Sequence, residues 1–112
     1  MPLKRVILEM GAGNDLHGSD YTKAALRAVQ DALHHSSLSL VRSLGLDSSA
    51  MQVEVTIGVQ KPERVDAAAV KASLPRGQVV VKVVKGGLEI VNDAGTGSTM
   101  MAHAAAIVRL DI

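Results

Sequence analysis

The sequence contains no cysteine, tryptophan or phenylalanine, and Tyr21 is its one aromatic residue. The absence of cysteine excludes disulfides, thiolate metal sites and a cysteine nucleophile. A single aromatic ring cannot form the stacking platform with which single-strand nucleic-acid binders hold bases. The core must therefore be built from valine, leucine, isoleucine, alanine and methionine. With so few bulky side chains, close packing requires short distances between helices and sheet.

An excess of charge of one sign is also missing. The chain has 112 residues, with 12 basic and 11 acidic side chains and a formal net charge of +1. Such a balance excludes the strong field that DNA, RNA or an anionic membrane would require. The apolar runs are far shorter than the ~20 residues of a membrane span, and the first run is too short for a signal peptide. We expect one cytoplasmic domain over residues 1–112, with no nucleic-acid or membrane partner.

Alternating apolar and polar residues give the clearest strand prediction, which runs from Met51 to Val59. Two further strands flank Gly86-Gly87, a pair typical of a two-residue hairpin turn. A loop is expected at residues 93–98. The complete set of predicted strands comprises residues 4–10, 51–59, 78–85, 88–92 and 104–112.

Helical spacing of apolar residues predicts one long helix over residues 20–44. Ser19 is expected to be its N-cap, and Gly45 its C-terminal cap. A shorter helix is expected to begin after Asp66 as N-cap and to run through Leu74. The helices and strands together predict the order β-α-β-α-β-β-β, an α+β fold with a mixed, largely antiparallel sheet and helices on one face.

The valine-rich strand at residues 79–84 carries apolar side chains on both of its faces. Helices that cover one face leave the other face in need of a cover, and another subunit is the simplest one. We therefore expect a homo-oligomer.

Chemistry is concentrated in one segment, between the first predicted strand and the first helix. Eight residues there contain three glycines, a carboxylate and an imidazole, in the order Gly11-Ala12-Gly13-Asn14-Asp15-Leu16-His17-Gly18. A simple connection needs only a turn residue and an N-cap, so the additional Asp15 and His17 indicate a site for an anion, a metal or a proton transfer.

One interpretation of this segment is an anion site. The amides of Gly11, Gly13 and Gly18, with Ser19, could donate to a phosphate or oxyanion at the start of the helix. The dinucleotide-binding pattern would need a glycine where Leu16 stands. Asp15 would oppose an anion, so Arg27, Lys23 or a metal ion would have to supply a counter-charge.

A second interpretation is a partial metal site, with a divalent metal as cofactor. In an extended segment Asp15 and His17 point the same way and could share one ion. Two ligands are too few for a catalytic zinc, and the residues considered as a third ligand are His34, His35, His103, Glu9 and Asp31. A neighbouring subunit could also complete the site.

In the structural alternative the same residues have structural roles only and take part in no reaction or ligand binding. Asp15 would brace the loop backbone, His17 would donate to a carbonyl or carboxylate, and the glycines would provide positive φ.

Two weaker candidate sites lie elsewhere in the chain. Residues 95–98 could bind an anion or form a hairpin connection. Pro2 is similar to the amino-terminal proline that acts as general base in the tautomerase superfamily.

The spacing Gly11-x-Gly13-x-Asp15-x-His17-Gly18 resembles a family of small uncharacterised proteins recognised by a GxGxDxHG signature, which implies no particular activity. Gly13-Asn14-Asp15-Leu16-His17 is also similar to a stretch of methylerythritol cyclodiphosphate synthase, in which the Asp and His bind zinc. That enzyme's third ligand would fall near Leu26 or Arg27, and neither can serve. The second resemblance implies a trimer-forming layer of the chorismate-mutase-like or cyclodiphosphate-synthase-like kind.

Two functional hypotheses follow. In the first, the protein is an enzyme or ligand-binding protein for a small polar or anionic molecule, with Asp15 and His17 as acid/base pair or metal ligands and Ser19, Arg27 and the glycines as binding residues. In the second, the protein is a non-catalytic oligomer, trimeric or higher, in which the segment only fixes the geometry between strand and helix.

Overall fold

A computed structural model describes residues 3–16, 20–34, 51–74 and 78–111. These described residues form a mixed α+β domain with one five-stranded, mostly antiparallel sheet, two α-helices and a short 3₁₀ helix. The elements in chain order are β1 (Leu3–Asp15), α1 (Tyr21–His34), β2 (Gln52–Val59), η2 (Pro62–Arg64), α3 (Ala67–Ala72), β3 (Gln78–Lys85), β4 (Leu88–Val91) and β5 (Ser98–Asp111). None of the helices in these residues is long and apolar enough to cross a membrane.

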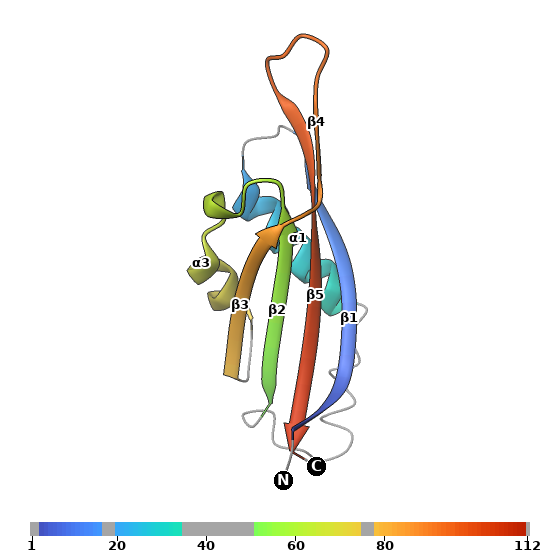
Figure 1. The fold of residues 1–112 in the computed structure, drawn as a ribbon, viewed down its shortest axis with the longest axis vertical. Helices are drawn as coiled ribbons and strands as arrows, with labels where there is room; N and C mark the ends of the chain where they lie inside the picture. The colour runs from blue at the N-terminus through green and yellow to red at the C-terminus, as the bar shows by residue number, and fades with distance from the viewer. Residues whose placement is uncertain (1–2, 17–19, 35–50, 75–77, 112) are drawn as a thin grey trace.

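The long strand β5 lies at the centre of the sheet. The strand order is β1-β5-β2-β3, and only the pair β2 and β3 is parallel. On its side away from β1, β5 pairs with β4 through residues 98–101 and with β2 through residues 103–109. Figure 1 shows that β4 and the start of β5 form a hairpin that extends past the helices at the end opposite both termini. The molecule is consequently elongated, with extents of 55 × 22 × 19 Å.

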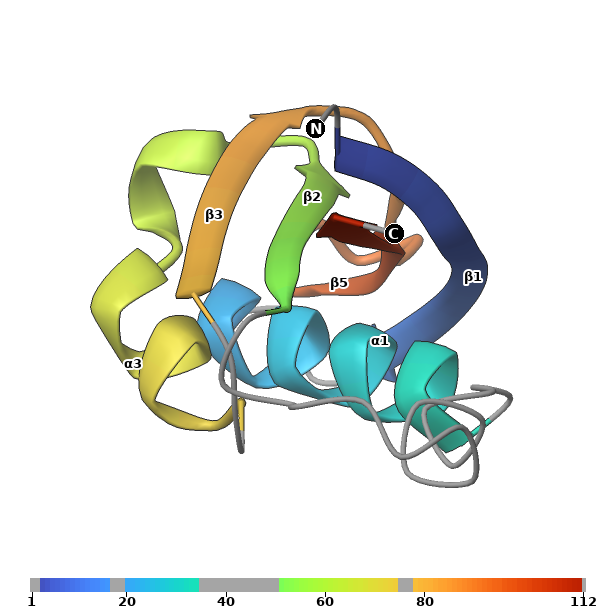
Figure 2. The ribbon, with the colours of Figure 1, turned by 90° about the horizontal axis from the view of Figure 1, so that it is seen from below.

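Both α-helices cover the same face of the sheet, as the view along the strands shows (Figure 2). We call this the inner face and the opposite one the outer face. Small residues dominate where α1 meets β5, since Ala24, Ala25 and Ala28 pack on the same core as Ala102 and Ala104. Larger buried side chains come from the inner face of β2, namely Val53, Val55, Ile57 and Val59. The small-residue core predicted from composition is therefore confirmed.

The helix starts have the expected chemistry, with one correction. Asp66 caps α3 as predicted, because its side chain accepts a hydrogen bond from the amide of Ala69 at 3.1 Å. At α1, however, Asp20 makes the capping contact predicted for Ser19, and its Oδ1 accepts from the amide of Lys23 at 2.9 Å. Several other predicted features lie outside the described residues: Pro2, His17, Gly18, Ser19, His35 and the helix beyond residue 34. The same holds for the side chain of His34.

Two predicted boundaries and one predicted turn are wrong. Residues 11–15 of the glycine segment are not a loop, because β1 continues through Gly11 and Gly13 to Asp15 and pairs with β5 along this length. The last strand starts at Ser98, since the hairpin with β4 extends it. The Gly86-Gly87 turn does not join paired strands either, because β3 pairs with β2 and β4 pairs with β5.

Gly86 and Gly87 instead carry the chain across the end of β2. A Cβ on Gly86 would lie 3.2 Å from the Cα of Gly58, and Gly87 has a φ of +66°. The side chain of Gln60 donates to both of their carbonyl oxygens, at 3.1 and 3.0 Å. This crossing places β4 in line with β2 and so creates the hairpin that extends from the body.

Candidate functional site

Gly11 and Gly13 lie directly beneath α1. A Cβ on Gly11 would come within 2.3 Å of the backbone nitrogen of Ala32, and one on Gly13 would come equally close to that of Ala28. No real side chain tolerates such distances, so the approach of the helix backbone requires glycine at both positions. The structural alternative assumed a positive φ at these glycines, and neither Gly11 nor Gly13 has one. Among the described residues only Gly87 and Gly95 do.

Two charged side chains of α1 cover the free edge of β1. The guanidinium of Arg27 donates to the carbonyl oxygen of Asn14 at 2.7 Å, and the carboxylate of Asp31 accepts from the amide of Ala12 at 2.9 Å. Exposed strand edges recruit further strands unless they are blocked. Arg27, predicted as a counter-charge, and Asp31, considered as a metal ligand, both satisfy edge groups of β1.

Asp15 ends β1, and its side chain is only 3% exposed. Its Oδ2 accepts a hydrogen bond from the amide of Asp20 at 3.0 Å, just before α1 begins. Asp20 in turn caps the helix through Lys23, so the two carboxylates organise the passage from strand to helix. This is the bracing role that the structural alternative predicted for Asp15.

The described residues considered as a third metal ligand do not converge on Asp15. His103 is exposed on the outer face, where it pairs across the sheet with Ala12 and Gly58. Asp15 points to the inner face beside Met100. Within the described ranges no cluster of three or more His, Cys, Asp or Glu side chains could hold a metal ion. The catalytic and metal-binding roles of Asp15 and His17, and the binding roles of Gly11, Gly13, Gly18, Ser19 and Arg27, stay predictions.

A polar cluster that sequence reasoning missed joins the start of α1 to the hairpin. The hydroxyl of Tyr21 donates a hydrogen bond to the carboxylate of Glu89 on β4. The guanidinium of Arg64 lies 5.3 Å from the centre of the Tyr21 ring, a cation–π distance. Burial, together with the hydrogen bond to Glu89 and its negative charge, raises the pKa of Tyr21 to about 12. The signal in the sequence was the lone aromatic residue at a helix start.

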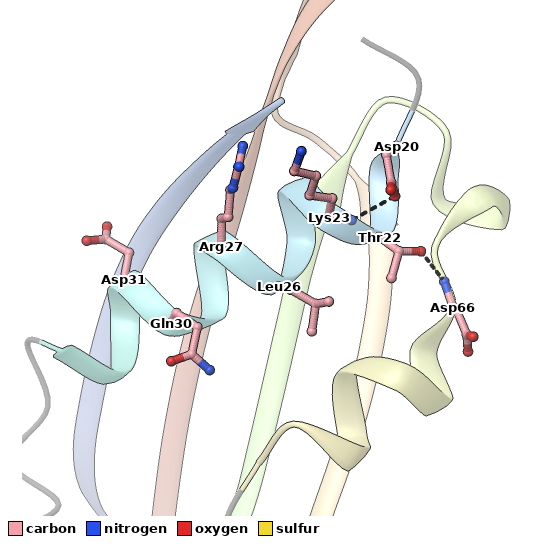
Figure 3. Close-up of a pocket in the computed structure, with 8 residues that line it drawn as sticks. All are labelled: Asp20, Thr22, Lys23, Leu26, Arg27, Gln30, Asp31 and Asp66. Atoms are coloured by element: carbon pink, nitrogen blue, oxygen red, sulfur yellow. Dashed lines mark hydrogen bonds between the residues drawn. The ribbon is translucent and has the colours of Figure 1, made fainter. Parts of the chain in front are cut away.

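An open groove of about 660 Å³ runs along the solvent side of α1 toward the start of α3 (Figure 3). Its lining comprises Asp20, Thr22, Lys23, Leu26, Arg27, Gln30, Asp31 and Asp66. Asp20, Arg27 and Asp31 make the backbone contacts described above, and Thr22 accepts from the amide of Asp66 at 2.9 Å. The groove therefore consists largely of groups that serve the fold, and its charges are mixed.

The outer face carries large apolar side chains that no described element covers. They come from three strands: Leu8 and Met10 on β1, Val80 and Val84 on β3, and Leu88 and Ile90 on β4. Met10 is 64% and Ile90 65% exposed. The predicted surplus of apolar surface on the face opposite the helices is thus present.

One charged cluster lies on the same face at the end nearer the termini. Glu54 accepts from Arg109 at 2.8 Å and lies 3.3 Å from the ammonium of Lys82. The hydrogen bond from Arg109, followed by that from Lys82, holds the pKa of Glu54 below its ordinary value. The outer face therefore combines an apolar surface with a cluster of both signs of charge.

Comparison with known proteins identifies a family and a related fold. The model of the Lin0512 family, described as conserved hypothetical protein, matches residues 5–109. A crystal structure of an FtsZ-like protein of unknown function from Nostoc punctiforme is 34% identical, with a TM-score of 0.86, over 100% of this chain and 99% of that one. No curated protein matches the chain. The predicted kinship with an uncharacterised family is confirmed, while its GxGxDxHG signature and the cyclodiphosphate synthase resemblance stay predictions.

Proposed function

The chain belongs to the Lin0512 family of conserved hypothetical proteins, and from this premise we propose that it is a non-catalytic module that associates with copies of itself, as a trimer or larger oligomer. The cytoplasmic location expected from the absence of cysteine is part of the same proposal. In this reading the Gly11–Gly18 segment serves the fold, and the outer face of the sheet is the working surface.

The observation that carries the proposal is the exposed apolar outer face. Monomeric soluble proteins rarely expose large contiguous apolar patches, and larger ones mark interaction sites. Met10 and Leu8 on β1 lie across from Ala105 and Ile107 on β5, so this surface is continuous between strands. A 112-residue domain also gains proportionally more from added burial than a larger one does.

The glycine segment supports the non-catalytic part of the proposal. A ligand that approached Gly11 or Gly13 from the inner face would meet the backbone of α1, which already lies where their Cβ atoms would be. The carboxylate of the segment, that of Asp15, accepts a hydrogen bond from the amide of Asp20. Each of these residues therefore has a structural task.

Size measurement by gel filtration with light scattering tests the proposal. The unaltered chain should elute as a trimer or higher. Met10→Glu puts a charge into the apolar face and should give a folded monomer, judged by an unchanged circular dichroism spectrum. Ala68→Glu, a matched change on the exposed side of α3, should leave the size unaltered. A monomeric unaltered chain, or a Met10→Glu variant of full size, contradicts the proposal.

A second candidate function is supported by the position of Asp15 and Arg27. A carboxylate that is 3% exposed ends β1, and the Arg27 guanidinium reaches the carbonyl of the preceding residue, Asn14. A small polar or anionic molecule, or a divalent metal, bound by Asp15 and His17 would lie near the Arg27 guanidinium. In a thermal-shift series with inorganic phosphate, Zn²⁺ and Mn²⁺, this function predicts a rise in melting temperature that Asp15→Asn and His17→Ala abolish. Absence of any shift in the unaltered chain removes this candidate.

A further inference from the structure

His103 lies in the middle of the outer face. It pairs with Ala12 on β1 and with Gly58 on β2, and Gly58 pairs in turn with Val84 on β3. This row of residues crosses the sheet from β1 to β3, and the imidazole within it is exposed. Because alanine and glycine have little or no side chain, the residues on either side of the ring do not shelter it.

Exposed apolar side chains surround His103 on the same face. Met10 and Leu88 pair with β5 two residues to either side of His103, Met10 toward the termini and Leu88 toward the hairpin. Val84 lies in the same row as His103, and all three apolar side chains are exposed. A second copy that covers these three side chains must therefore also cover His103.

The residues that adjoin His103 on the outer face of the three nearest strands are uncharged, and they are Ala12, Asn14, Thr56, Gly58, Met101 and Ala105. Asp31 and Arg27 reach β1 from α1, but their contacts lie at its edge away from β5. Lys85 and Glu89 alternate with residues of the outer face and so point to the inner face, where Glu89 accepts from Tyr21. No described element therefore turns a charge toward His103.

The charged groups of the outer face all lie on the side of His103 toward the termini. Glu54 is across from the residue four places along β5, roughly 13 Å away at the usual rise of a strand. This carboxylate already pairs with Arg109 and Lys82. The complete set on this side is Arg5, Glu54, Lys82, Arg109 and Asp111, in which cations outnumber anions.

From this setting we infer that copies of the chain associate through the outer face only while His103 is neutral, so that mildly acidic solution separates them. The inference rests on the proposed function and adds the regulation of that surface. A neutral imidazole can be buried among apolar side chains when an uncharged group forms a hydrogen bond with it, and Asn14 and Thr56 of the facing copy are such groups. An imidazolium would lose its water without a carboxylate to compensate, which is strongly unfavourable.

Proton linkage gives the direction and the size of the effect. A protonated copy must release its proton before its outer face is covered, so association weakens as the pH falls through the range in which histidine titrates. A histidine with the ordinary pKa of about 6.5 is about nine-tenths neutral at pH 7.5 and about one-tenth neutral at pH 5.5. The association constant should therefore fall about tenfold for each imidazole that the interface buries. Glu54 keeps its charge in this window, because its pKa is held below the ordinary value.

Sedimentation equilibrium at pH 7.5 and pH 5.5, at one ionic strength, tests the inference, and circular dichroism at both pH values records that the fold is kept. His103→Gln cannot take up a proton, so it should associate equally at the two pH values. His103→Lys carries a charge at both and should be a folded monomer already at pH 7.5. His35→Gln, at a position outside the described residues, is the matched control and should keep the full response to pH.

The outcomes separate the inference from the proposed function. A tenfold or greater weakening in acid that His103→Gln abolishes and His35→Gln retains supports the inference. Equal or stronger association in acid, a response that persists in His103→Gln, or an oligomeric His103→Lys variant overturns it and leaves self-association standing. An unaltered chain that is monomeric at pH 7.5 overturns the proposed function and the inference with it.

Discussion

The two faces of the sheet are made from the same five strands but have opposite design. On the inner face the residues under α1 are glycine and alanine, and the helix approaches so closely that added atoms would collide with its backbone. On the outer face, β1, β3 and β4 carry leucine, methionine, isoleucine and valine side chains that stay exposed. The contrast teaches that large apolar side chains occur on both faces, and that those on the outer face are the ones no described element covers. The predictions below test how sharply the two faces differ.

The largest effect is expected where α1 lies closest to the sheet. Gly13→Ala should lower the unfolding free energy by about 3 kcal/mol or more, because its Cβ would lie 2.3 Å from the nitrogen of Ala28 and the helix would have to move. Urea unfolding measures the change. Gly97→Ala is the matched control, since its nearest neighbour would be 3.6 Å away, and it should change stability little. Equal losses in the two variants would remove the close-approach explanation.

The next effect concerns Asp15 at the end of β1. Asp15→Ala should lower the unfolding free energy by about 2 kcal/mol, since the amide of Asp20 loses its acceptor in a buried position. Asp15→Asn keeps an oxygen there and should lose less. Chemical denaturation of the two variants side by side measures the difference. If both are as stable as the unaltered chain, the carboxylate does not brace the turn and a binding role becomes the better account.

Tyr21 joins the start of α1 to the hairpin of β4 and β5. Tyr21→Phe should cost about 1.5 kcal/mol, the value of a hydrogen bond to a charged acceptor. The folded-state pKa of Tyr21 is raised from 10.0 to about 12, so its stabilising contribution is complete below pH 10 and is lost as the pH rises from 10 to about 12. Across this window the unfolding free energy of the unaltered chain should fall with pH more steeply than that of Tyr21→Phe. If the two fall in parallel, the ionisation of Tyr21 does not contribute to the pH dependence of stability.

The smallest effect is expected on the outer face. Glu54→Gln should hardly change the unfolding free energy of a monomeric Met10→Glu background, because solvent screens the ion pairs with Arg109 and Lys82. The small stabilisation that the Glu54 carboxylate contributes should be present near neutral pH and be lost in acid, because the pKa of Glu54 is lowered in the folded state. In the oligomer the same change should weaken association. A large loss of unfolding free energy in the monomeric background would show that the cluster stabilises the fold rather than the association between copies.

Local patterns in the sequence predicted β2 and the cap of α3 well. The alternation from Met51 to Val59 matches the buried and exposed positions of β2, and Asp66 caps α3 as expected. The surplus of apolar residues opposite the helices was also predictable, because the valines at 79–84 fall on both faces of one strand. These features depend on residues close together in the chain.

Features that depend on distant contacts were missed. Glycines usually end a strand, and only the position of Ala28 and Ala32 on α1 explains why Gly11 and Gly13 lie inside β1. Gly86 and Gly87 cross the end of β2 because β4 pairs with β5, which begins ten positions after β4 starts. Tyr21 and Glu89 are 68 residues apart, so no local spacing indicates their hydrogen bond.

The central claim is that the outer face is covered by other copies of the chain in solution. Sedimentation equilibrium of the unaltered protein over a wide range of concentrations tests it most directly. The account predicts a species with the mass of a trimer or a larger closed ring, in exchange with monomer only at high dilution. A single species of 11.7 kDa at every concentration would contradict it.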